Sequence, residues 1–306
     1  MQTTLAKSVK FTGTGLHTGR PAKMTVRPAG AGAGIVFRRL DVDGVQSDVR
    51  AHWSNVIVSP LNTRIENSDG VSVSTIEHIM AALAGCGIHN ALIEISGPEV
   101  PILDGSSARF VRGLLAAGLE RGAAPLDLIE VLKPVSVHQG DASAELRPAS
   151  GLRISFTIDF ADAAIGHQFH NLDLANGTFV RELCDSRTFC RKADVDAMHA
   201  NGLALGGSYD NAVVVDGDRI LSPGGLRHAN EAVRHKMLDA LGDLNTAGAP
   251  ILGHYVGVRS GHALTNRLLQ ALFASQHNWR LRRCDPATAA RLPGAGIAAE
   301  DLVAVA

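Results

Sequence analysis

The chain carries one pattern twice, and this internal repeat limits its possible folds more than any other feature. The segments VRPAGAGAGIVF (26–37) and LRPASGLRISF (146–156) share an RPA turn, a glycine bend and an alternating strand. The segments EHIMAALAG (77–85) and RHKMLDALGD (234–243) are predicted helices with His at the second position and Met two residues later. A strand and a second amphipathic helix follow each of them, so the repeat predicts an α+β protein with two similar layered halves.

The two copies differ in length. Arg27 and Arg147 are 120 positions apart, whereas His78 and His235 are 157 positions apart, so the second copy contains roughly 37 additional residues. We place them in an insert at about 190–221, which has a helical run, a Gly-Gly bend and the apolar strand NAVVVD. The predicted domains are 1–125 and 126–284. A tail, 285–306, is rich in Ala, Pro and Gly and is expected to be peripheral or mobile.

Composition excludes several kinds of protein. Of the 306 residues 45% are hydrophobic, which is enough for two domains, and 29 Lys and Arg nearly balance 30 Asp and Glu. No basic excess indicates nucleic acid as a partner. Four scattered cysteines and the absence of an apolar signal core or membrane-length apolar run predict a cytoplasmic protein without a transmembrane segment. The glycine run AGAGAG precedes the strand IVFRR and no helix, which argues against a dinucleotide site.

The helix EAVRHKMLDALGDL (231–244) has a polar stripe made of His235, Asp239 and Asp243. These residues are four apart and therefore share one helix face, because four residues advance a helix by only about 40° beyond a full turn. His235 and Asp239 have the spacing of two metal ligands on a helix. A solvated helix face has the same pattern, so the stripe by itself leaves both interpretations open.

The first copy offers a third ligand and a base. His78 occupies the position that matches His235, next to the small residues of its own helix, and Glu77 precedes it directly. A hydrolytic metal site needs a carboxylate that accepts a proton from the attacking water, and Glu77 could provide it. The alternatives are a buried histidine bonded to a carbonyl group, and a helix-terminal glutamate behind a Ser74 or Thr75 cap.

Three more side chains are candidates for the chemistry. His262, in SGHALTN, could act as a general acid if a carboxylate such as Asp243 keeps it charged, or it could only cap the following helix. Lys236 could hold a polar substrate group, although most lysines lie on the surface. Thr188, in DSRTFC, offers a hydroxyl group.

Taken in order, STIEHIMAAL, PILDGSS, SRTF, GLALGGSYDNAVVVD, RHKMLDALGDL and SGHALTN resemble the zinc-dependent UDP-3-O-acyl-N-acetylglucosamine deacetylases over about residues 3–280. These enzymes of Gram-negative bacteria catalyse the committed step of lipid A biosynthesis. The resemblance implies two similar α+β domains from an internal duplication, with the helices sandwiched between two β-sheets and a small βαβ-type insert in the second domain. It also implies a substrate of UDP-3-O-[(3R)-3-hydroxyacyl]-N-acetylglucosamine, hydrolysed to UDP-3-O-acyl-glucosamine and acetate.

The resemblance also implies roles for individual residues. His78, His235 and Asp239 would bind one Zn²⁺, with Fe²⁺ as the alternative ion. Glu77 would be the general base, and His262 would be the general acid, oriented by the carboxylate of Asp243. Thr188 would donate to the oxyanion.

Substrate contacts follow from the same resemblance. Lys236 would hold the polar part of the substrate, Phe189 would contact the substrate beside Thr188, and the insert would form a passage for the acyl chain. Its expected lining residues are Met198, Leu203, Ala212 and Val214. The UDP end is assigned to Asp159, Phe160, His17 and Arg259. The chain departs from some members at PLNTR, where Asn62 and Thr63 stand in a loop that carries a cysteine near the metal in those members.

Two other functions remain open from the sequence. One is a zinc-dependent amidase or esterase that acts on a different acylated sugar, and the other is a non-catalytic binding member of the fold. The resemblance further implies a monomer in the cytoplasm, with transient contact with the inner face of the inner membrane as an open alternative.

Overall fold

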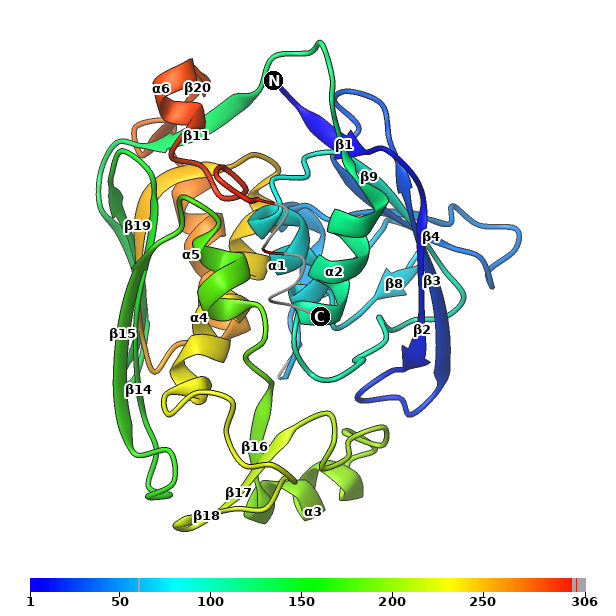
Figure 1. Ribbon diagram of the computed structural model, residues 1–306, viewed down its shortest axis with the longest axis vertical. Helices are drawn as coiled ribbons and strands as arrows, with labels where there is room; N and C mark the ends of the chain where they lie inside the picture. Colours follow the sequence, from blue (N-terminus) through cyan, green and yellow to red (C-terminus); the bar gives the residue numbers. More distant parts are fainter. Residues whose placement is uncertain (60, 299–300, 302–306) are drawn as a thin grey trace.

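The protein is a sandwich in which four helices lie between two sheets, as the computed structural model shows for residues 1–59, 61–298 and 301 (Figure 1). The first sheet has the order β2-β3-β9-β4-β5. Its strands are β2 (Val9–Thr14), β3 (Pro21–Pro28), β9 (Ala91–Ile95), β4 (Ile35–Arg39) and β5 (Asp48–Arg50). The helices are α1 (Glu77–Gly85), α2 (Ala108–Ala117), α4 (Glu231–Leu244) and α5 (His262–Phe273).

The second sheet repeats the pairing pattern of the first. Strands β12 and β13 form a hairpin, β13 pairs antiparallel with β19, β19 pairs parallel with β14, and β14 pairs antiparallel with β15. Their bounds are β12 (Val135–Gln139), β13 (Ala142–Pro148), β19 (Ile251–Val258), β14 (Leu152–Asp159) and β15 (His167–Asp173). The pairs β2-β3, β3-β9, β9-β4 and β4-β5 have the same directions. This agreement supports the duplication inferred from the sequence.

The two sheets bury equivalent rows of side chains. In the first sheet Val26 lies beside Ile93, which lies beside Phe37, and all three are fully buried. In the second sheet Leu146, Tyr255 and Ile154 form the matching row and are also fully buried. Alternate residues of a strand point to opposite faces, so each sheet turns its apolar face to the helices. One continuous core therefore joins both halves.

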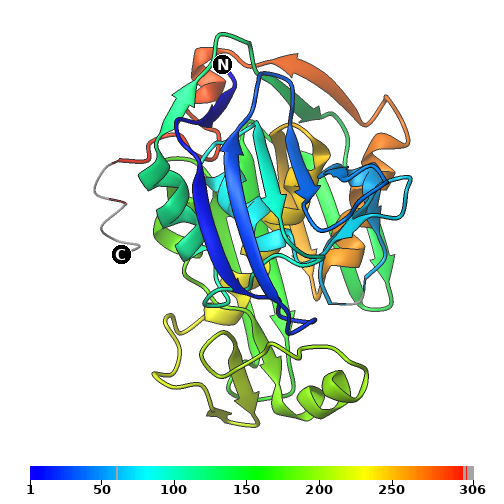
Figure 2. The ribbon, with the colours of Figure 1, turned by 90° about the vertical axis from the view of Figure 1, so that its right-hand side faces the viewer.

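Each half carries its own addition to the sheet and helices. The predicted insert of the second half forms β16 (Phe189–Arg191), α3 (Lys192–Ala200), β17 (Val213–Asp216) and β18 (Arg219–Ile220). Strands β16 and β17 are parallel with α3 between them, which confirms a small βαβ unit at one end of the molecule (Figure 2). The first half has a three-stranded sheet that sequence analysis missed: β6 (Val56–Ile57), β7 (Arg64–Glu66) and β8 (Ser72–Val73).

Several short elements complete the chain. Strands β1 (Thr3–Leu5) and β10 (Leu119–Arg121) pair with each other, and β11 (Asp127–Val131) and β20 (Trp279–Arg283) extend the second sheet. The second amphipathic helix of the first copy, α2, ends at its C-cap Gly118, which has a positive φ of 76°, and β10 follows. Within the described ranges no helix is long and apolar enough to cross a bilayer.

The described part of the tail, predicted to be peripheral or mobile, is folded against the second half. Helix α6 (Pro286–Ala289) is capped by Asp285, and Leu292 is buried against Leu126 and Leu252. Arg181 forms an ion pair with the buried carboxylate of Asp301 at 2.8 Å. The remainder of that prediction, at 299–300 and 302–306, lies outside the described residues. The described tail thus belongs to the folded structure.

Candidate active site

The polar stripe of α4 is buried, which excludes the solvated-face interpretation. His235, Asp239 and Asp243 are only 2%, 5% and 3% exposed. The stripe faces α1 of the other half, and the two helices are in close contact. A Cβ atom at Gly242 would lie 2.0 Å from the backbone oxygen of Glu77, so only glycine permits this approach. The stripe therefore meets the residues at the start of α1.

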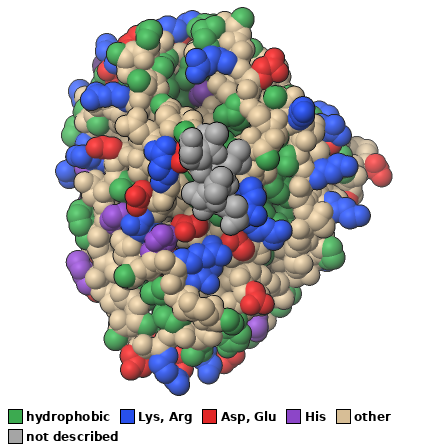
Figure 3. Space-filling model, in the orientation of Figure 1, with side chains coloured by type: hydrophobic (Ala, Val, Ile, Leu, Met, Phe, Trp, Pro, Cys, Tyr) green, Lys and Arg blue, Asp and Glu red, His purple; other side chains and the backbone are tan. Residues whose placement is uncertain are grey.

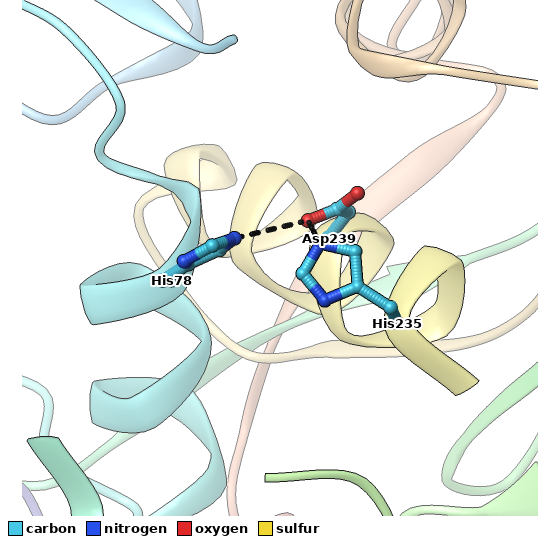
Figure 4. A group of neighbouring side chains, drawn as sticks. All are labelled: His78, His235 and Asp239. Carbon is cyan, nitrogen blue, oxygen red and sulfur yellow. Dashed lines mark ion pairs between the residues drawn. The ribbon is translucent and has the colours of Figure 1, made fainter. Parts of the chain in front are cut away.

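Two histidines and one carboxylate converge at this helix contact (Figure 4). Oδ1 of Asp239 lies 3.3 Å from Nε2 of His235 and 3.7 Å from Nε2 of His78, and it is buried without a hydrogen-bond partner. The backbone oxygen of Ser186 accepts a hydrogen bond from Nδ1 of His235 at 2.9 Å, which turns the lone pair of Nε2 toward the other two groups. The buried, unpaired oxygen and the two imidazole nitrogens fit a divalent metal ion such as Zn²⁺.

Burial prepares the two histidines as neutral ligands. It lowers the pKa of His78 to about 3, an effect to which the neighbouring His235 adds, and burial also lowers the pKa of His235. Burial opposes the charge of Asp239, but His235 and Lys236 outweigh it and hold its pKa far below the usual range. The protonation states that a metal ion requires are therefore already favoured.

Glu77 lies beside the three candidate ligands and points into the same space. It is 4% exposed, and its Oε1 lies 4.0 Å from Nε2 of His262. Burial, more than any nearby charge, raises the pKa of Glu77 to about 7. The alternative interpretation, in which Ser74 or Thr75 caps α1, is wrong, because Ser74 donates to Pro98 and Thr75 donates to Glu99. Glu77 is a buried carboxyl group near neutrality, which suits a general base.

His262 is the first residue of α5 and forms a pair with Asp243. Its Nδ1 donates to Oδ2 of Asp243 at 2.9 Å, while its Nε2 lies 3.9 Å from Oδ2 of Asp239. Burial opposes the charge of His262, but Asp243 and Glu77 outweigh it and raise its pKa to about 9. At neutral pH this imidazole carries a proton that it can donate through Nε2.

Lys236 is not a surface lysine. Its Nζ donates to Oδ2 of Asp239 at 2.9 Å, and only 17% of its side chain is exposed. Burial opposes the charge, yet Asp239 outweighs it and raises the pKa of Lys236. The ammonium group is thus held charged at the edge of the ligand cluster.

A loop held by a buried ion pair places Thr188 and Phe189 next to the cluster. Arg187 donates to Glu231 from its backbone N–H at 3.0 Å and from its guanidinium at 2.8 Å, and both side chains are buried. Thr188 N–H donates to the backbone oxygen of Gly105 at 2.8 Å. The ring of Phe189 packs 6.4 Å from the ring of His235 and 5.5 Å from that of Phe160.

A cavity of about 670 Å³ runs from Thr188 into the insert. The predicted substrate residues divide into those that line it and those that do not. The residues that line it include His17, Thr188, Phe189, Met198, Ala212 and Val214. Leu203, Lys236 and Phe160 are not among the residues that line it. Asp159 and Arg259 do not line it either, and instead pair with each other.

Sequence reasoning missed two residues that connect the site. The carboxylate of Glu99 accepts from the N–H groups of His17 and Thr18, both at 2.8 Å, and from the hydroxyl of Thr75 at 2.9 Å. It therefore ties the His17 loop to the start of α1, where Thr75 has a positive φ of 58°. Thr63 contacts Glu77, Asp243 and His262. Neither contact leaves a spacing pattern in the sequence, because both join segments distant along the chain.

The comparisons with known proteins agree on one protein family. The family model for UDP-3-O-acyl N-acetylglycosamine deacetylase matches residues 2–274. The UDP-3-O-acyl-N-acetylglucosamine deacetylase of Phenylobacterium zucineum is 48% identical over 281 residues, which are 92% of this chain and 96% of the relative. The enzyme of that name from Idiomarina loihiensis is also 48% identical, over 91% of each chain. A third, from Shewanella sp. strain ANA-3, is 42% identical over 302 residues, 97% of this chain, so that the similarity extends into the tail, contrary to expectation. The chain belongs to the UDP-3-O-acyl N-acetylglycosamine deacetylase family.

Proposed function

We propose that this protein hydrolyses the N-acetyl group of UDP-3-O-[(3R)-3-hydroxyacyl]-N-acetylglucosamine, with release of acetate, as the committed step of lipid A biosynthesis. One observation carries the proposal: the ligand atoms of His78, His235 and Asp239 lie within 4.8 Å of one another, with Glu77 and His262 on the same space. Family membership makes the enzyme a deacetylase, and the site suits metal-assisted amide hydrolysis.

We propose that one Zn²⁺ is the native ion, held by His78, His235 and Asp239, with Fe²⁺ as the alternative. Two imidazole nitrogens and one carboxylate oxygen are ligands that either ion accepts. When bound, such an ion supplies a Lewis acid that polarises the acetamide carbonyl group and lowers the pKa of water.

The remaining steps are assigned to side chains. Ionised Glu77 accepts a proton from the water that attacks the acetamide carbon. The hydroxyl of Thr188 donates to the oxyanion that develops on the carbonyl oxygen. His262 then donates a proton from Nε2 to the departing glucosamine nitrogen, while Asp243 stabilises the imidazolium ion. The C–N bond breaks, and acetate and the free amine leave.

The cavity in the insert suits the 3-O-acyl chain, because it is lined by Met198, Ala212 and Val214 and begins at Thr188. We assign Lys236 and Phe189 to the polar part of the substrate, and His17 and Phe160 to its UDP end. Asp159 and Arg259, which form an ion pair with each other, are further candidates for contact with UDP. We further propose that the protein is a monomer. We also propose that it acts in the cytoplasm, since a nucleotide sugar is its substrate.

The test is acetate release by the Zn²⁺-loaded protein from the UDP sugar with and without its 3-O-acyl chain. The proposal predicts a loss of at least about a hundredfold in kcat/KM when the chain is absent, since remote binding energy supports the reaction. Equal activity on both substrates would indicate a different zinc amidase or esterase. Neither bound metal nor acetate release would indicate a non-catalytic member.

A further inference from the structure

Thr63 lies in the loop between β6 and β7, and all its polar groups are used inside the site. It is 4% exposed. Its backbone oxygen accepts from the N–H of Ile76 at 3.3 Å, directly before α1. Its N–H donates to Oε2 of Glu77 at 3.0 Å. The loop of the first half is thereby fastened to the start of α1 and to the carboxylate of the base.

The hydroxyl of Thr63 reaches the other half of the molecule. Oγ1 donates to Oδ1 of Asp243 at 2.5 Å and lies 3.3 Å from Nδ1 of His262. The other oxygen of Asp243, Oδ2, accepts from Nδ1 of His262 at 2.9 Å. Both carboxylate oxygens are therefore held, and a carboxylate with two fixed partners cannot rotate without breaking a charge-assisted hydrogen bond.

The position of Thr63 has a direct consequence for the geometry of the two proton-transfer groups. Its N–H donates to the Glu77 carboxylate and helps to fix the orientation of the base. Its hydroxyl holds the carboxylate that orients His262. Because Nε2 of His262 and Oε1 of Glu77 lie 4.0 Å apart, a small rotation of either group changes the distance between acid and base.

We propose that Thr63 is a positioning residue of the deacetylation reaction. It fixes the base Glu77 relative to the acid His262 across the contact between the two halves. This inference rests on the proposed function. Within the described residues the hydrogen bonds of Thr63 go to Ile76, Glu77, Asp243 and His262, none of them a candidate metal ligand, and Thr63 does not line the cavity; its loss should therefore lower kcat and leave KM and metal content unchanged. Interactions that orient a reacting group typically contribute about 10- to 100-fold when they are removed.

The experiment compares Thr63→Val, which keeps the size and the N–H but loses the hydroxyl, with Thr63→Ser, which keeps the hydroxyl. Thr63→Val should lower kcat by about 10- to 100-fold with KM within about twofold, and Thr63→Ser should retain activity within about threefold. In the His262→Ala background the effect of Thr63→Val should largely disappear, since a residue that acts through His262 is not additive with it.

Thr246→Val is the matched control. Thr246 is 1% exposed and donates its hydroxyl to the backbone oxygen of Asp243 at 2.6 Å. It is therefore a buried threonine that is bonded to the backbone of Asp243 and not to the Asp243 carboxylate. This variant should lose stability and keep kcat. Metal content and the melting temperature are measured for every variant.

Three outcomes would overturn the inference: wild-type kcat in Thr63→Val, an equal loss in Thr63→Ser, or full additivity with His262→Ala. If Thr63→Val does not fold, Thr63→Ala and Thr63→Ser form the substitute pair, and equal kcat values for these two overturn it. Absence of acetate release from the Zn²⁺-loaded wild-type protein would instead overturn the proposed function, and the role of Thr63 with it.

Discussion

Helices α1 and α4 occupy equivalent places in two halves with the same topology, yet they contribute unequally to the site. The matching histidines, His78 and His235, face each other with ring centroids 5.0 Å apart and planes at 86°. One turn later α4 has Asp239, where α1 has Ala82. The small residue of one copy leaves room for the carboxylate of the other. A repeated scaffold thus forms one asymmetric site, because its copies meet face to face.

The residues directly before the two matching histidines also differ. Glu77 of α1 turns into the site, whereas Arg234, at the matching position of α4, turns away and pairs with Glu182 at 2.9 Å. The face of the molecule shown in Figure 3 mixes positive and negative side chains, in keeping with the balanced composition. The chemistry therefore depends on local pairs inside the helix contact.

The largest expected effect comes from removal of either matching histidine. His78→Ala and His235→Ala should each lose the bound ion and reduce acetate release by about a thousandfold or more, since a metal ion supplies several kcal/mol of transition-state stabilisation. Metal analysis of the purified variants checks this. Retention of one ion per chain by either variant would show that the two helices do not share it.

Replacement of Glu77 and Arg234, the residues that precede the matching histidines, should separate catalysis from stability. Glu77→Gln should lower kcat by about 10²- to 10⁴-fold while metal content stays constant, because an amide accepts no proton. Arg234→Gln should keep kcat and lower the melting temperature. Comparable kcat losses in both variants would remove the functional distinction between α1 and α4.

The pH dependence of activity tests the role of Glu77 in α1 as the base and of His262 in α5 as the acid. Activity should rise with pH as Glu77 loses its proton, with a pKa of about 7, and fall as His262 loses its proton, with a pKa of about 9. A bound cation favours deprotonation of both groups. The apparent pKa values of the rising and falling limbs of the pH profile therefore lie at or below these values. In Glu77→Gln the acid limb should vanish; a profile of unchanged shape would reject this assignment.

Gly85 and Gly242 are equivalent residues with different neighbours. A Cβ at Gly242 would meet backbone atoms of Glu77, whereas one at Gly85 would lie 1.9 Å from the ring of Phe179. Gly242→Ala should cost about 3 kcal/mol and also lower kcat, since α1 must move. Gly85→Ala should lower stability and keep kcat in the protein that remains folded. Urea unfolding and kinetics together check both statements.

The smallest effect should come from the insert, which only the second half has. Met198→Trp narrows the cavity and should raise KM for the acylated substrate by roughly threefold to tenfold, on the order of 1 kcal/mol of lost binding. Leu203→Trp is the control outside the cavity lining and should leave KM unchanged. Equal changes in both variants would argue against this cavity as the acyl site.

Much of the fold followed from local patterns. Helices 77–85 and 231–244 begin and end where the sequence predicts, because each places apolar residues at helical spacing before a glycine or asparagine. The insert and the repeated sheets were also predictable. The small sheet β6-β7-β8 was not, since strands of two or three residues carry too few side chains to show alternation.

The sequence by itself determined the two copies, the spacing of His235 and Asp239, and the pairing of Glu77 with His78 on one helix. These are local properties that periodicity exposes. Only the tertiary structure decided that the polar stripe of α4 is buried and that Thr63 joins the acid to the base. Those contacts span 14 to 199 residues of chain, and they exist because two apolar sheet faces bring α1 and α4 into the same core.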